Sequence, residues 1–159
     1  MDKLTDAEVG TLVRELYIDA EPDIVFDVVS SPEYVEQWWP DEARYRLEPG
    51  SPGELVFRTA EGDEIVQQFS VVESNPPRTF SFRWTHQAGE GPAAGNSLLV
   101  TFALTASGSG TTLTMTETGF RERGWEEAEL ERQFREHVDG WNFFLPRLVT
   151  YVAGVEAAS

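Results

Sequence analysis

Two kinds of hydrophobic periodicity divide the chain. Residues 12–19 alternate between apolar and polar positions, which is typical of a half-buried strand. Glu21-Pro22-Asp23 then predicts a helix start, because proline suits an early helical position and acidic residues favour the positive end of the helix dipole. A second short helix is expected from Pro32 and should end by Trp38-Trp39-Pro40.

The middle of the chain predicts extended structure. Short turns rich in glycine, proline, serine and asparagine separate its segments, and such connections favour antiparallel hairpins over helical crossovers. The six predicted strands are rich in valine, threonine and phenylalanine and cover Arg44–Leu47, Glu54–Thr59, Glu64–Glu73, Arg78–His86, Ser97–Thr105 and Thr111–Thr118.

The period changes to 3.6 residues after Phe120, which predicts one long helix from about Trp125 to Val152. Its apolar stripe is expected to contain Leu130, Phe134, His137 or Val138, Trp141, Phe144 or Leu145, Leu148 and Tyr151 or Val152.

The order of these elements predicts an α+β fold of the helix-grip type. A seven-stranded antiparallel sheet with one apolar face must cover that face, and a single long amphipathic helix can do so if the sheet curves around it. The two short helices after the first strand would then close one end. We expect one domain over residues 11–154, with an N-terminal tail over 1–10 and a C-terminal tail over 155–159.

Composition narrows the classes of partner. The 159-residue chain has no cysteine and a formal net charge of −16, and such a surface repels phosphate backbones and anionic membranes. Nucleic-acid binding and membrane insertion are therefore not expected. The N-terminus lacks the basic-then-apolar pattern of a signal peptide, so a cytoplasmic location is the simplest interpretation.

Several strings, in their order and spacing, carry a family resemblance over residues 11–153. They are Ile18-Asp19-Ala20-Glu21-Pro22, Val25-Phe26-Asp27-Val28, Trp38-Trp39-Pro40, Glu73-Ser74-Asn75-Pro76-Pro77-Arg78, Gly110-Thr111-Thr112-Leu113-Thr114-Met115, Gly119-Phe120 and Gly140-Trp141. The chain resembles the START-like superfamily, also called SRPBCC or polyketide cyclase-like. Within it, the chain is similar to the branch related to the C-terminal domain of the heat-shock protein 90 ATPase activator.

The resemblance implies a helix-grip fold and a range of functions. The superfamily includes lipid and sterol carriers, hormone receptors and cyclases, and a shared fold does not transfer one of these functions. The chain also departs from the pattern at one point. Relatives often carry a histidine and a serine before the Gly-Phe pair, where this chain has Glu117-Thr118.

Strand and helix periodicity predicts which side chains face the interior. We expect an aromatic chamber with few polar groups, a composition that suits a small-molecule site as well as a plain core. The predicted ligand-binding set is Arg14, Trp38, Trp39, Phe57, Phe69, Phe80, Phe82, Trp84, His86, Met115, Glu117, Trp141, Phe144 and Leu145.

Glu117 is the most informative residue of this set. A carboxylate in an apolar chamber must be paired, hydrated or neutral, and Arg14 is a candidate partner because the first and last strands should be neighbours. The alternatives are a rim position in solvent and a purely structural ion pair. Strand alternation places His86 on the same inward face as Trp84, but its position at the strand end favours an exposed histidine. His137 lies on or beside the apolar stripe of the long helix, which favours a core histidine whose hydrogen bonds are satisfied.

These residues predict a binding module for an apolar or amphipathic small molecule. Two alternatives stay open: an interaction module that stimulates a chaperone ATPase, and a cyclase- or hydrolase-type enzyme that uses Glu117. No catalytic set is complete, and two distant histidines without cysteine predict neither a metal site nor a cofactor site. A monomer and a homodimer both fit the sequence.

Overall fold

The structure is a computed structural model that describes residues 10–158. In this part of the chain, the strands are followed by one long helix. The elements are β1 (Thr11–Ile18), α2 (Pro22–Ser30), α3 (Pro32–Val35), β2 (Glu42–Arg44), β3 (Pro52–Arg58), β4 (Glu64–Asn75), β5 (Thr79–Trp84), β6 (Leu98–Ser107), β7 (Gly110–Thr118), the 3-10 turn η1 (Arg121–Arg123) and α4 (Glu127–Ala158).

The strands form one antiparallel sheet in the order β1-β7-β6-β5-β4-β3-β2. Every pair except β1–β7 joins strands that are consecutive along the chain, whereas β1 and β7 meet although they are far apart in sequence. The helix-grip prediction and the neighbouring position of the first and last strands are therefore confirmed.

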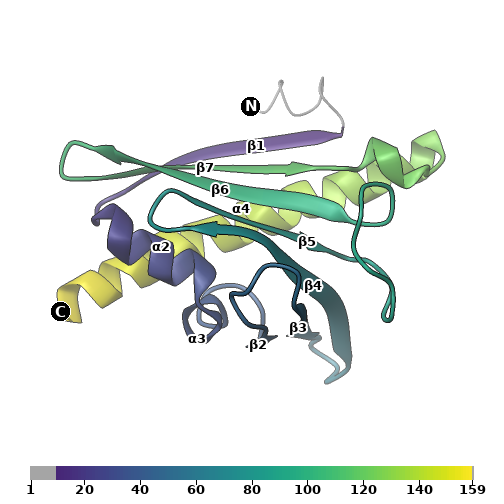
Figure 1. Cartoon of the computed structure of the whole chain (residues 1–159), viewed down its shortest axis with the longest axis horizontal. Helices are drawn as coiled ribbons and strands as arrows, with labels where there is room; N and C mark the ends of the chain where they lie inside the picture. The colour runs from purple at the N-terminus through teal and green to yellow at the C-terminus, as the bar shows by residue number, and fades with distance from the viewer. Residues whose placement is uncertain (1–9, 159) are drawn as a thin grey trace.

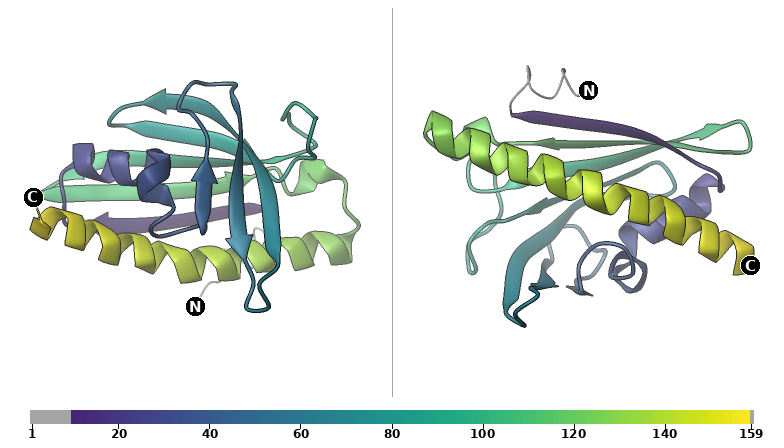
Figure 2. Two further views of the ribbon diagram at one scale, coloured as in Figure 1. Left: turned by 90° about the horizontal axis from the view of Figure 1, so that it is seen from below. Right: turned by 180° about the vertical axis from the view of Figure 1, so that it is seen from behind.

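Helix α4 lies along one face of the curved sheet, and α2 and α3 lie beside its C-terminal half (Figure 1). Seen from the other sides, the strands β3 and β4 bend around towards the helix (Figure 2). The apolar stripe explains this position, because α4 buries Leu130, Phe134, Trp141, Leu145 and Leu148 against the sheet.

The alternation of β7 brings a charged residue into this interior. Leu113, Met115 and Glu117 are fully buried, whereas the threonines between them lie on the other face. In β1 the same face carries Leu12, which pairs directly with Glu117. Strand periodicity therefore placed the carboxylate of Glu117 inside correctly.

Of the two predicted tails, the C-terminal one lies mostly within the described residues and the N-terminal one does not. Helix α4 continues to Ala158, four residues into the segment that we expected to be a C-terminal tail. The predicted N-terminal tail lies outside the described residues apart from Gly10. No helix within residues 10–158 is both long enough and apolar enough to cross a membrane.

Candidate functional site

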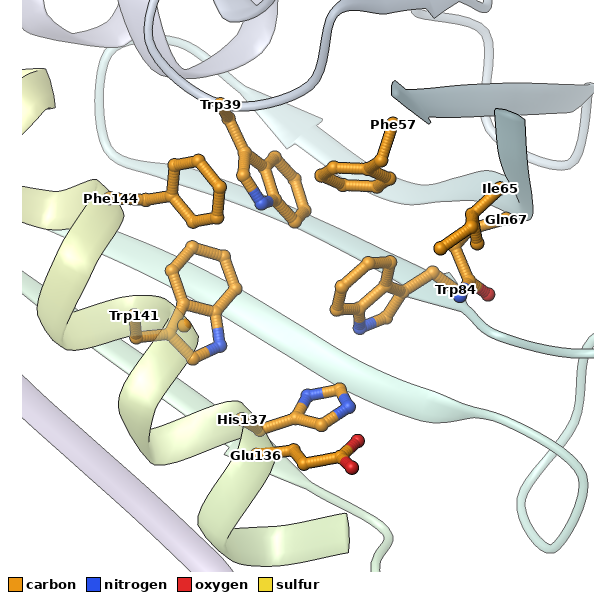
Figure 3. A pocket seen from close by; sticks show the side chains of 10 residues that line it. Trp39, Phe57, Ile65, Gln67, Trp84, Glu136, His137, Trp141 and Phe144 are labelled. Carbon is orange, nitrogen blue, oxygen red and sulfur yellow. The ribbon is translucent and has the colours of Figure 1, made fainter. Parts of the chain in front are cut away.

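A cleft of about 220 Å³ opens between the N-terminal half of α4 and the strands β3, β4 and β5. Aromatic side chains form most of its wall, and they come from four separate parts of the chain (Figure 3). The lining residues are Trp39, Phe57, Ile65, Gln67, Trp84, Glu136, His137, Gly140, Trp141 and Phe144.

One face of α4 supplies four of the ten lining residues. His137, Gly140, Trp141 and Phe144 stand at helical positions i, i+3, i+4 and i+7, which lie above one another on a helix surface. A Cβ atom at Gly140 would meet no other atom within 4 Å, so this position has room for a larger side chain.

Trp39 joins the two sides of the cleft. The centroid of its ring lies 4.9 Å from that of Trp141 on the helix and 5.0 Å from that of Trp84 on the sheet. Phe57 contacts Trp39 at 6.1 Å and Phe144 at 6.4 Å, so that the rings form a continuous wall. Tilted and edge-on ring pairs at these distances stabilise such a cluster beyond simple burial.

Glu117 lies behind this wall with none of its side chain exposed. The indole nitrogen of Trp84 donates to Oε2 at 2.8 Å, and the indole nitrogen of Trp141 donates to Oε1 at 2.8 Å. Nδ1 of His137 approaches Oε1 at 2.9 Å. Both oxygens are therefore satisfied, which meets the requirement that a buried charge be paired and hydrogen-bonded.

The same contacts fix the orientation of His137. Because an ionised carboxylate only accepts hydrogen bonds, Nδ1 is the donor and carries the proton. Burial by itself lowers the pKa of His137, but the charge and hydrogen bond of Glu117, with a smaller contribution from Glu136, raise it above its usual value. His137 therefore stays cationic to a higher pH than a free histidine.

The predicted ligand-binding set divides into a cleft wall and a core. Trp39, Phe57, Trp84, Trp141 and Phe144 line the cleft. The remaining aromatic and aliphatic members pack in the core: Trp38, Phe69, Phe80, Phe82, Met115 and Leu145, each at most 1% exposed. The expected chamber is thus largely filled by its own side chains, and the open space is a cleft at one side of it.

Arg14 does face α4, as predicted, but not as the partner of Glu117. Its Nε donates to Oδ1 of Asn142 at 2.9 Å and its Nη1 to the Val13 carbonyl at 2.8 Å. The donors that satisfy Glu117 are the two indoles and the imidazole, so the predicted Arg14–Glu117 pair is corrected to a Glu117–His137 pair.

His86 lies on the opposite face of the sheet, and its predicted inward position is wrong. Thr85 has a φ of 71°, a conformation that β-branched residues rarely adopt, and it ends the alternation that Trp84 would otherwise continue. His86 instead faces a second cavity, with Gln68 and Ser70. It is 8% exposed rather than a solvent-exposed strand end, and burial lowers its pKa.

Sequence reasoning missed Ile65, Gln67, Glu136 and Gly140 and placed His137 in the core rather than in a site. The helical spacing around Trp141 was the available signal, because 137, 140, 141 and 144 share one face. Ile65 and Gln67 carried no such signal, since the bend that brings β4 towards α4 arises from the curvature of the whole sheet.

Groups of metal-ligand type do not converge on the cleft. Within residues 10–158, no cluster of three or more histidine, aspartate or glutamate side chains is arranged to hold a metal ion.

The fold and the cleft define a START-like helix-grip domain. The chain belongs to the family described as Activator of Hsp90 ATPase homolog 1-like protein, whose profile matches residues 19–153. No curated protein matches the chain.

Solved structures of other proteins share the fold. A Mesorhizobium loti protein is 24% identical with a TM-score of 0.69, over 88% of this chain and 94% of its own. A Nitrosomonas europaea protein is 16% identical with a TM-score of 0.74, over 91% and 95%. DynU16, from the dynemicin biosynthetic locus, is 24% identical with a TM-score of 0.66 over 91% of this chain, which spans only 47% of DynU16.

Proposed function

We propose that the cleft between the sheet and α4 binds a small amphipathic aromatic molecule. The observation that carries this proposal is the convergence of three indole rings and two phenyl rings on one opening of about 220 Å³. Pockets of this kind, mostly apolar with a few placed polar groups, are the usual form of small-molecule sites.

The size of the cleft limits the ligand. An apolar cavity of about 150 Å³ is known to hold benzene, so a cleft somewhat larger suits one or two fused rings. A ligand that buries roughly 150–250 Å² of apolar surface, as a large aromatic side chain does, gains roughly 4–6 kcal/mol at about 25 cal/mol per Å². Because association itself has a cost, apolar burial alone predicts affinity that is millimolar or weaker.

Gly140→Phe tests this proposal without removing any side chain from the cleft wall. The new phenyl ring would enter the cleft, because Gly140 lines it and the Cβ position there is open. We expect Gly140→Phe to abolish binding of 2-methylnaphthalene, measured by following the indole N–H signals of Trp84 and Trp141 in an NMR titration. Native mass spectrometry of the freshly purified wild type would identify any molecule that co-purifies.

Gly154→Phe is the matched control, since Gly154 lies in the same helix with open space around it and outside the cleft. Gly154→Phe should bind the probe like the wild type. Unchanged binding in Gly140→Phe would place the probe elsewhere and count against the cleft.

The family match supports a second candidate function, stimulation of a chaperone ATPase, because the family description names the Hsp90 ATPase. If the chain has this role, adding it to purified Hsp90 of the same source should raise the rate of ATP hydrolysis. An unchanged rate at saturating concentration would remove this candidate and leave the small-molecule role.

A further inference from the structure

His137 presents its two ring nitrogens to two different environments. Nδ1 is held by the buried carboxylate of Glu117 at 2.9 Å. Nε2 has no hydrogen-bond partner among the described residues and is not buried, and the ring lines the cleft beside Trp84 and Glu136 (Figure 3). A ligand in the cleft would therefore meet a hydrogen-bonding atom of fixed orientation.

The groups around His137 decide which ligand atom suits Nε2. Glu117 from β7 and Glu136 from α4 are the charged groups that face the imidazole, while β5 and the segment before η1 contribute the uncharged rings of Trp84 and Phe120. Both carboxylates favour the protonated ring, in which Nε2 is a donor. Glu136 is itself paired with Arg132, whose Nη1 lies 2.7 Å from Oε2.

We propose that the ligand is a planar aromatic molecule with an oxygen acceptor, best a carboxylate or phenolate, which accepts a hydrogen bond from Nε2 of His137 while its ring lies against the aromatic wall. This inference rests on the function proposed above for the cleft. Glu117 acts through His137 as a positioning residue, because its oxygens already accept three hydrogen bonds and do not reach the ligand.

A cationic molecule is the alternative ligand for this aromatic cleft, since aromatic faces attract quaternary ammonium groups. The imidazolium at the edge of the cleft opposes such a ligand. Of the two carboxylates that could attract it, Glu117 already accepts hydrogen bonds from an imidazole and two indoles, and Glu136 is paired with Arg132.

Four probes of one shape separate these ligand classes: 2-naphthoate, 2-naphthol, 2-methylnaphthalene and trimethyl(2-naphthyl)ammonium. Titrations at about 0.15 M salt keep the Debye length near 8 Å and reduce repulsion of the anion by the negative surface. We expect 2-naphthoate to bind at least about tenfold more tightly than 2-methylnaphthalene, as a hydrogen bond to a charged group predicts.

His137→Asn is the decisive variant. Its side-chain amide can still donate to Glu117 from the place of Nδ1, but it has nothing at the place of Nε2. The ratio of the affinities for 2-naphthoate and 2-methylnaphthalene should fall to about one in this variant, whereas Gly154→Phe should keep the ratio of the wild type. His137→Gln, whose amide reaches the place of Nε2, should regain part of the preference.

The wild type alone provides a second test if the variant does not fold. The affinity for 2-naphthoate should fall as pH rises through the NMR titration of His137, whereas that for 2-methylnaphthalene should stay constant. Equal affinities for all the probes, or tighter binding of the ammonium probe, would overturn this inference and leave the cleft as a binding site. No binding of any probe would overturn the proposed function as well.

Discussion

A single buried carboxylate connects the sheet, the helix and the cleft at the residue scale. Glu117 extends from β7 and accepts hydrogen bonds from Trp84 on β5 and from both His137 and Trp141 on α4. Three rings that line the cleft are thus oriented by one residue that does not line it. Charge-assisted hydrogen bonds of this kind are stronger than neutral ones and fix direction as well as distance.

Replacing this carboxylate by its amide should destabilise the protein. In Glu117→Gln the amide NH₂ has to face an indole or imidazole N–H that donated to the lost oxygen, which leaves buried donors unsatisfied. We expect the free energy of unfolding to fall by about 1–3 kcal/mol, measured by urea denaturation. The pKa of His137 should also fall below that of a free histidine, since burial would remain without the attraction of Glu117.

Glu15→Gln is the matched control, because Glu15 lies on the exposed face of β1. This variant should unfold like the wild type. If Glu117→Gln were equally stable, the three hydrogen bonds to Glu117 would not hold the cleft wall in place.

At the scale of the elements, the sequence predicted what depends on local periodicity. The alternation of β7 placed Glu117 inside, and the 3.6-residue period of α4 placed Trp141 on the sheet-facing side. The prediction failed at Thr85, where one positive φ turned His86 to the other face of the sheet. A single unusual dihedral angle is invisible in a pattern of residue types.

The partner of Glu117 shows a second limit of pattern reasoning. Both Arg14 and His137 lie on elements next to β7, and the strand order alone made Arg14 a sound candidate. The helix decides the outcome, since its position over the sheet brings His137 and Trp141 to the carboxylate and Asn142 to Arg14. How a helix lies across a sheet follows from the packing of many side chains, which no short string of residues encodes.

On the scale of the whole molecule, two histidines in unlike environments make stability depend on pH in opposite ways. The pKa of His137 is raised, so its protonated form stabilises the folded state fully below the unfolded pKa of about 6.5. That contribution is lost as pH rises from about 6.5 through the higher folded value. The pKa of His86 is lowered by burial, so its contribution is present above about 6.5 and is lost as pH falls.

Measurements above about pH 6.5 isolate the contribution of His137 to the free energy of unfolding. The chain has only two histidines and no cysteine, so few other side chains titrate between about pH 6.5 and 8.5. The free energy of unfolding of the wild type should therefore fall as pH rises across this range, measured by urea denaturation at constant ionic strength. His137→Asn, which cannot bind the proton, should show a flat profile. The same slope in both proteins would mean that the Glu117–His137 ion pair does not stabilise the fold. A flat profile in the variant alone would show that His137, which faces the cleft, causes the pH dependence of the free energy of unfolding in this range.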